Sequence, residues 1–98
     1  MTRVALCGLL SIASVAACMP VRTDASIHAA ERSLARAAEL GADRRAPYEY
    51  YLAREHLAQA HIEEGEAEYD DASEYALSAE RYANRAAELA KAAKAKEP

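Results

Sequence analysis

The chain has 98 residues and a formal net charge of −4, and it contains neither tryptophan nor phenylalanine. This length suits one small domain with a limited core. The negative charge argues against a general nucleic-acid binder, which needs a basic patch to neutralise phosphates. The core has to form from alanine, leucine, isoleucine and tyrosine, and this composition favours helices packed closely on alanine.

The chain opens with the pattern of an export signal. Residues 1–3 carry one positive charge, at Arg3, and residues 4–17 carry none, so a basic segment precedes an apolar one. As a helix, residues 4–17 would span roughly 21 Å, which is short of the about 30 Å of hydrocarbon in a bilayer. We therefore expect residues 1–17 to be removed as a signal peptide.

Small residues end this segment in front of a cysteine, in the order Val15, Ala16, Ala17 and Cys18. The stretch resembles the bacterial lipobox, in which a branched apolar residue and two small residues precede a lipidated cysteine. The resemblance implies that the Cys18 thiol receives a diacylglyceryl group, that the signal is cleaved before Cys18, and that the new amino terminus is acylated. The alternative is that Cys18 is a small apolar residue ending a core segment. The loop expected at residues 19–22 argues against that alternative.

Cys7 fits the same motif poorly, because Leu6 is not small and little apolar sequence precedes it. Removal of residues 1–17 takes Cys7 away and leaves one cysteine, which cannot form an internal disulfide. Arg3 is removed as well, but none of the 16 acidic residues is, so the formal charge of −4 becomes −5.

The first helix is predicted over residues 24–40, after a lipidated tether at residues 18–23. Thr23 or Asp24 is a suitable N-cap, and Gly41 is a natural C-terminal stop. Four apolar residues with the i, i+3, i+7 spacing of one helix face follow the cap: Ile27, Ala30, Leu34 and Ala37.

The second helix is predicted over residues 47–64, with Pro47 in its first turn. The short linker at residues 41–46 should place it antiparallel to the first helix. It carries two apolar stripes on roughly opposite sides. One consists of Tyr48, Tyr51, Leu52, Ala58 and Ile62, and the other of Tyr50, Ala53, Leu57 and Ala60. A helix that is apolar on two sides requires two neighbours.

The third helix, predicted over residues 67–95, has the clearest periodicity. Alanine recurs every seven residues, with tyrosine or leucine three places on, and such a heptad describes a continuous packing seam. The seam consists of Ala72, Tyr75, Ala79, Tyr82, Ala86 and Leu89. Alanine buries little apolar surface, and each Å² of buried apolar surface contributes only about 25 cal/mol to stability. The isolated monomer should therefore be marginally stable. The stretch after Ala90 should fray because it has little bulky apolar surface.

These elements predict an all-α fold over residues 24–98: a small antiparallel three-helix bundle, or a helical hairpin with a long alanine-rich C-terminal helix. Around the second turn, Tyr69 and Ala72 match the tetratricopeptide (TPR) pattern, whereas Gly65 and Ala79 are each one residue out of place. One imperfect repeat cannot form a solenoid, which needs about three repeats. The resemblance implies a TPR-like hairpin at most.

A second resemblance covers nearly the whole chain after Cys18. It rests on the lipobox, on GADRRAPYEYYLAREHLAQA and on the acidic turn into YDDASEYALSAERYANRA. Together these stretches resemble the short bacterial lipoproteins of the domain-of-unknown-function 4398 family, and APYEYYLAREHL is the most specific piece. The resemblance implies a helical domain in the cell envelope and brings no established activity or catalytic residue. In such lipoproteins a residue other than aspartate after the cysteine implies outer-membrane sorting, and Met19 meets that condition.

Two groups of polar residues contain side chains that can bind metals. His56 and His61 are five residues apart, a step that turns a helix by about 140°, whereas HExxH zinc sites use i, i+4. Acidic residues also cluster at the second turn: Glu63, Glu64, Glu66, Glu68, Asp70, Asp71 and Glu74. They lie where acids favour the dipole of the third helix. A weak calcium site or a basic partner patch is the alternative, although the run lacks the ligand order of an EF-hand.

The expected function is structural and not enzymatic. No serine, histidine and acid arrangement and no glycine-rich phosphate loop is present, and we expect no metal and no cofactor. Tyr48, Tyr50 and Tyr51 are interpreted as core residues, with a sugar-stacking platform as the alternative. The prediction is an outer-membrane lipoprotein, attached through Cys18 and facing the periplasm, whose helical domain binds an envelope protein or a second copy. The alternative is a binding protein for peptidoglycan fragments or a cation.

Overall fold

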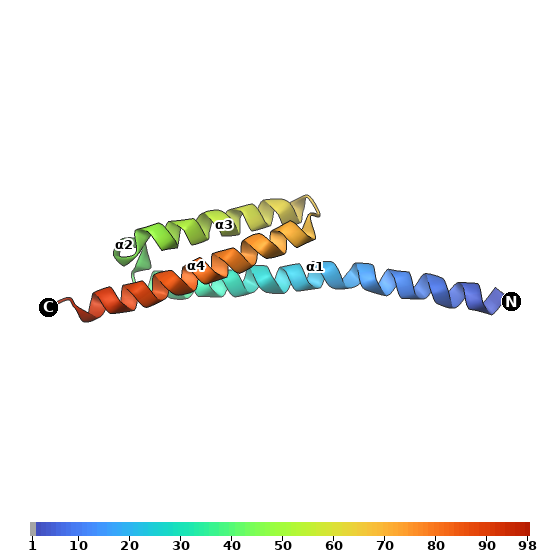
Figure 1. Cartoon of the computed structure of the whole chain (residues 1–98), viewed down its shortest axis with the longest axis horizontal. Helices are drawn as coiled ribbons and strands as arrows, with labels where there is room; N and C mark the ends of the chain where they lie inside the picture. Colours follow the sequence, from blue (N-terminus) through green and yellow to red (C-terminus); the bar gives the residue numbers. More distant parts are fainter. Residues whose placement is uncertain (1) are drawn as a thin grey trace.

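The computed structural model describes the backbone of residues 2–98 and the side chains of residues 19–98. The described backbone forms four helices, α1 (Thr2–Glu39), α2 (Ala42–Arg45), α3 (Pro47–Gly65) and α4 (Tyr69–Ala95). The fold is all-α, as expected. The three long helices form an up-down-up bundle in which α3 runs antiparallel to α1 and α4 (Figure 1). The α4 helix packs against both others, whereas α1 and α3 contact each other less.

The main difference from the predicted elements lies at the start of the first helix. Residues 19–22, expected as a loop, belong to α1, which continues through Pro20. Thr23 is not an N-cap, because it lies inside α1 and is only 1% exposed. Its Oγ1 is 3.1 Å from the Tyr69 carbonyl oxygen and 3.0 Å from Ser73 Oγ, both in α4. These contacts hold this part of α1 on the bundle despite the backbone hydrogen bond that proline removes.

The connection between α1 and α3 is short and helical. Gly41 ends α1 with a φ of 72°, in the left-handed region that favours glycine. A Cβ at this position would also meet Nη1 of Arg45. The single turn of α2 then fills the predicted linker, and Pro47 begins α3 in its first turn, as expected.

The core is made almost entirely of alanine. The seam alanines Ala72, Ala79 and Ala86 are at most 1% exposed. A second row of α4 alanines is also buried: Ala76, Ala83, Ala87 and Ala90. One cluster joins Ala37, Ala42 and Ala46 to Ala86, Ala87 and Ala90, and another joins Ile27 to Ala60 and Ala76. Small side chains on facing helices therefore let the three axes approach closely.

The larger seam residues lie at the edge of this core. Tyr75 is 37% exposed, while Tyr82 and Leu89 are partly buried. The rings of Tyr75 and Tyr82 both lie beside His56 of α3, at centroid distances of 5.9 and 5.2 Å. The seam tyrosines therefore contact α3, whereas Ser73 contacts α1.

The α4 helix ends at Ala95, the predicted end of the third helix. Arg45 Nε and Nη2 each lie 2.8 Å from a carboxylate oxygen of Glu97. This two-point ion pair ties the end of the chain to α2. The hydrogen bond from Arg45 lowers the pKa of the Glu97 carboxyl below its usual range.

Candidate interaction surface

One face of α3 packs on α4. Ala53 and Ala60 are fully buried there, and Leu57 and Tyr50 pack against the two core clusters from α3. These four residues are one of the two predicted apolar stripes. This stripe is therefore the inner face of α3.

The opposite face of α3 is exposed. Tyr48, Tyr51 and Ile62 retain 73%, 48% and 52% of their accessible surface, Ala58 and Glu55 are exposed, and Leu52 is partly buried. We call this set the outer stripe: Tyr48, Tyr51, Leu52, Glu55, Ala58 and Ile62. The expectation that α3 would have two neighbours on opposite sides is wrong within the described residues, because α3 buries the alanine face and leaves the tyrosine face to solvent.

The outer stripe is hollowed at its N-terminal half. Pro47, Tyr48, Tyr51, Leu52 and Glu55 line an open groove of about 380 Å³. Tyr51 forms one wall, and its ring meets that of Tyr50 edge-on at 5.2 Å. The Arg54 guanidinium lies 5.6 Å from the centroid of the same ring, in the range of a cation–π contact. The Tyr51 ring at this groove therefore contacts both Tyr50 and Arg54.

The three tyrosines of α3 have different surroundings. Tyr50 packs on the core cluster of Ala86, Ala87 and Ala90, so its interpretation as a core residue is confirmed. Tyr48 and Tyr51 are exposed, and the same interpretation is wrong for them. The three helices approach one another on alanine, which leaves little room for large rings in the core. The inner face of α3 holds one tyrosine, Tyr50.

The two histidines of α3 contact different helices. His56 Nδ1 donates to the Leu52 carbonyl oxygen at 2.9 Å, and its ring lies beside α4. His61 Nε2 lies 3.2 Å from Glu31 of α1. The residues whose side chains are described hold no group of three or more metal-ligating side chains arranged to bind an ion.

A small polar cluster on α1 was not predicted from the sequence. His28 lies 3.0 Å from Glu31 and 3.4 Å from Asp24, and Glu31 in turn contacts His61. The i, i+3 and i, i+4 spacings of these α1 residues are a signal for side-chain pairs on one helix face. The contact with α3 has no such local signal.

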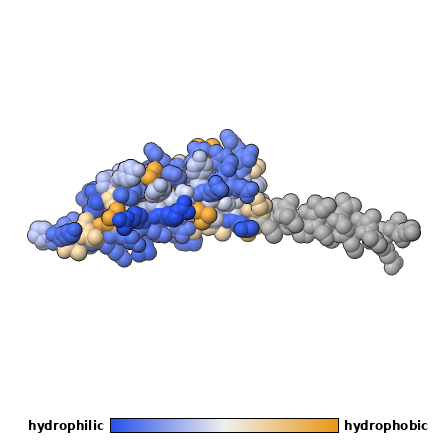
Figure 2. Space-filling view, in the orientation of Figure 1, coloured by the Kyte–Doolittle hydropathy of each residue, from blue (hydrophilic) through white to orange (hydrophobic). Residues whose placement is uncertain are grey.

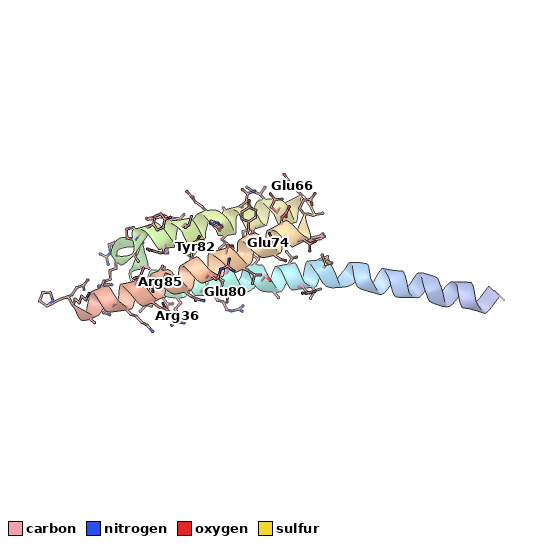
Figure 3. All side chains as sticks on the ribbon, in the orientation of Figure 1. Arg36, Glu66, Glu74, Glu80, Tyr82 and Arg85 are labelled. Carbon is pink, nitrogen blue, oxygen red and sulfur yellow. The ribbon has the colours of Figure 1, made fainter. Side chains whose placement is uncertain are left out.

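The acidic residues 63–74 lie at the turn between α3 and α4, and Figure 3 shows Glu66 and Glu74 at that end of the bundle. A polar cavity of about 370 Å³ is lined by His56, Glu63, Asp71, Glu74, Tyr75 and Ser78. Gln59 donates to Glu63 at 2.8 Å. Asp70 and Asp71 occupy the first turn of α4 and Lys94 its last turn, the arrangement that favours the helix dipole.

Much of the surface is polar. The face in Figure 2 is mainly hydrophilic, with isolated hydrophobic residues. In the part of the chain open to description, no helix has the length and apolarity that a membrane crossing needs. The predicted cleavage motif (Val15, Ala16 and Ala17) and the lipidation site Cys18 lie outside the described side chains.

Comparison with known proteins identifies a family but no individual relative. No curated protein and no solved structure matches the chain. The model of a protein family described as a domain of unknown function (DUF4398) matches residues 25–97. This range covers most of α1 after Thr23 and all of α2, α3 and α4. The chain therefore belongs to the DUF4398 family.

Proposed function

We propose that this protein is a lipid-anchored lipoprotein of the bacterial cell envelope whose helical domain is a non-catalytic protein-interaction module in the periplasm. The observation that carries the interaction role is the outer stripe of α3, which leaves two tyrosines and an isoleucine exposed while Ala53 and Ala60 of the inner face are fully buried. Exposed apolar surface arranged along one helix face is typical of a binding surface.

The envelope location is supported by the sequence. Val15, Ala16 and Ala17 precede Cys18 in the order of a lipobox, after an apolar segment that follows Arg3. Met19 favours sorting to the outer membrane. One acyl chain gives only marginal membrane binding, whereas two or more hold a protein stably. A diacylated or triacylated Cys18 would therefore keep the module at the membrane.

The anchor is tested by Cys18→Ser in the full chain, expressed in a bacterium that processes lipoproteins. We expect this variant to lose incorporation of labelled palmitate and to leave the membrane fraction or remain unprocessed. Cys7→Ser is the matched control, because Cys7 lies in the removed signal, and it should label and fractionate like the parent. Unchanged labelling and fractionation of Cys18→Ser would refute the lipoprotein assignment.

A second candidate function is the binding of peptidoglycan fragments or a cation. The exposed rings of Tyr48 and Tyr51 favour the first ligand, since sugars stack on aromatic faces. The acidic lining of the cavity beside Glu63 and Glu74 favours the second. Thermal melting with muropeptides and with calcium tests both. A rise in melting temperature that Tyr51→Ala or Glu74→Gln abolishes would support this function over the interaction module.

A further inference from the structure

The outer stripe has the spacing of a coiled-coil seam. Tyr48, Tyr51, Glu55, Ala58 and Ile62 follow one another at steps of three and four residues, the a and d positions of two heptads. All five are exposed. From the first to the last, the stripe extends roughly 21 Å along α3, or about four helical turns. A second helix laid along α3 would therefore meet side chains at every position where a coiled coil needs them.

The middle of the stripe is charged. Glu55 lies seven residues from Tyr48 and seven from Ile62, and its side chain is also part of the groove lining. Among residues with described side chains, no cation forms an ion pair with Glu55; the adjacent Arg54 lies over the Tyr51 ring instead. A helix covering the stripe would bury this carboxylate, which is costly unless a partner charge accompanies it.

This charge argues against a second copy as the occupant. Because Glu55 is the midpoint of the stripe, any pairing of two α3 helices that overlaps most of the stripe brings both Glu55 carboxylates within about one turn of each other. The two carboxylates come together whether the helices pair parallel or antiparallel. Like charges placed together in an interface disfavour that complex.

A membrane surface and a glycan strand fit the stripe less well. Helices that lie on membranes carry lysine and arginine beside the apolar face, whereas α3 has Glu49, Glu55, Glu63 and Glu64 against the single cation Arg54, histidines aside. A glycan would stack on the two tyrosines, but the apolar positions continue for two further turns through Ala58 and Ile62. Apolar side chains at coiled-coil spacing on both sides of Glu55 match a helix.

We propose that the outer stripe of α3 binds an amphipathic α-helix of another envelope protein, and that this helix places a lysine or arginine opposite Glu55. The inference rests on the proposed interaction function and names the class of partner. Aliphatic residues of the partner fill the groove beside Tyr51 and cover Ala58 and Ile62. The basic residue compensates the buried carboxylate and selects this partner over a second copy.

The test uses the full chain and three-heptad designed peptides labelled with a fluorophore. The peptides carry leucine and isoleucine at a and d, except that the central a position is lysine in one and glutamate in the other. Fluorescence anisotropy measures their binding. We expect the parent chain to prefer the lysine peptide by about tenfold, which corresponds to about 1.4 kcal/mol. Glu55→Lys should reverse this preference.

The control variant is Glu66→Lys, which makes the same charge change in the turn after α3, away from the outer stripe. It should keep the preference of the parent, and circular dichroism verifies that each variant is helical. Equal binding of the two peptides, or no binding of either, would overturn the proposal. A stable dimer in sedimentation would also overturn the proposal. The same holds if muropeptides or lipid vesicles, and not the lysine peptide, shield Tyr48 and Tyr51 from solvent.

The two proposals fail separately. Peptide binding depends on the α3 face and not on the lipid, whereas palmitate labelling of Cys18 depends on the anchor and not on α3. A lipidated chain that binds neither peptide would refute the helix-docking inference and would not affect the proposed envelope location.

Discussion

Thr23 joins α1 to the start of α4 through one hydroxyl group. Its Oγ1 lies 3.1 Å from the carbonyl oxygens of Met19 and Tyr69 and 3.0 Å from Ser73 Oγ. A hydroxyl donates one proton and accepts others, so it can donate to one carbonyl and accept from Ser73. It is the only buried polar residue among the described side chains. In a core of alanine, this group fixes where α1 meets α4 along the bundle axis.

We expect Thr23→Val to destabilise the chain by about 1–3 kcal/mol, because it keeps the side-chain shape but leaves buried polar partners unsatisfied. Ser26→Ala is the control: Ser26 donates only to the Arg22 carbonyl of its own helix, and its loss should cost at most about half a kcal/mol. Urea unfolding followed by circular dichroism measures both. Equal costs would show that the Thr23 contacts do not hold the helices together.

The alanine seam of α4 determines how closely the helices approach. Ala79 is 1% exposed, so a larger side chain there has to push helices apart. We expect Ala79→Leu to destabilise the chain by about 1–3 kcal/mol through overpacking. Thermal melting should show this clearly, because a domain of this size has only about 3–5 kcal/mol of stability.

The matched control for this element is Ala92→Leu, the same change at an exposed position of α4. It should alter the free energy of unfolding by no more than about half a kcal/mol. If Ala79→Leu and Ala92→Leu both have the melting temperature of the parent, the seam does not limit the packing of α4. Ala79→Ser should be tolerated better than leucine, because it adds one small atom.

The helix spans were largely predictable, because their signals are local. Gly41 marks the C-terminal end of α1, Pro47 marks the start of α3, and the seven-residue repeat of α4 is regular. The continuation of α1 through Pro20 was not predictable, because local rules end a helix near proline while the contacts of Thr23 come from residues far along the chain.

The candidate surface was only partly predictable, for a physical reason. The sequence showed two apolar stripes on α3 without showing which one faces inward. Large aromatic side chains are usually the stronger core formers, yet the inner face is the one with Ala53 and Ala60. The face that matches the alanines of α4 points inward, because small side chains on both helices allow close approach along the whole helix.

At the scale of the whole molecule, charge is distributed unevenly along the bundle. The acidic residues 63–74 gather at the α3–α4 turn. The end with α2 and the C-terminus carries five cations, Arg44, Arg45, Lys91, Lys94 and Lys96, against Asp43 and Glu97. Figure 1 shows that the acidic turn lies toward the N-terminus of α1. Thr23 contacts Tyr69 at the start of α4, so the acidic end is the one nearest Cys18.

If Cys18 is the anchor, this arrangement predicts the orientation of the module. The acidic turn should lie next to the membrane, and α2 should lie roughly 30 Å farther away, because residues 19–39 of α1 rise about 1.5 Å each. The expected mature chain carries a formal net charge of −5, so anionic headgroups repel the bundle as a whole. An upright bundle keeps more of this charge away from the surface than one that lies flat. An upright bundle keeps the outer stripe of α3 free for a partner.

The measurement uses lipidated chain in nanodiscs with a fluorophore on one added cysteine, since the acylated Cys18 does not react with the label. Ala67→Cys in the turn should be quenched strongly by a spin label on the lipid headgroups, whereas Arg44→Cys in α2 should be nearly unaffected. Raising the ionic strength screens the repulsion and should reduce the difference between the two sites. Equal quenching at low salt would mean that the bundle lies flat, with both ends at the membrane, and that the outer stripe competes with lipid for its partner.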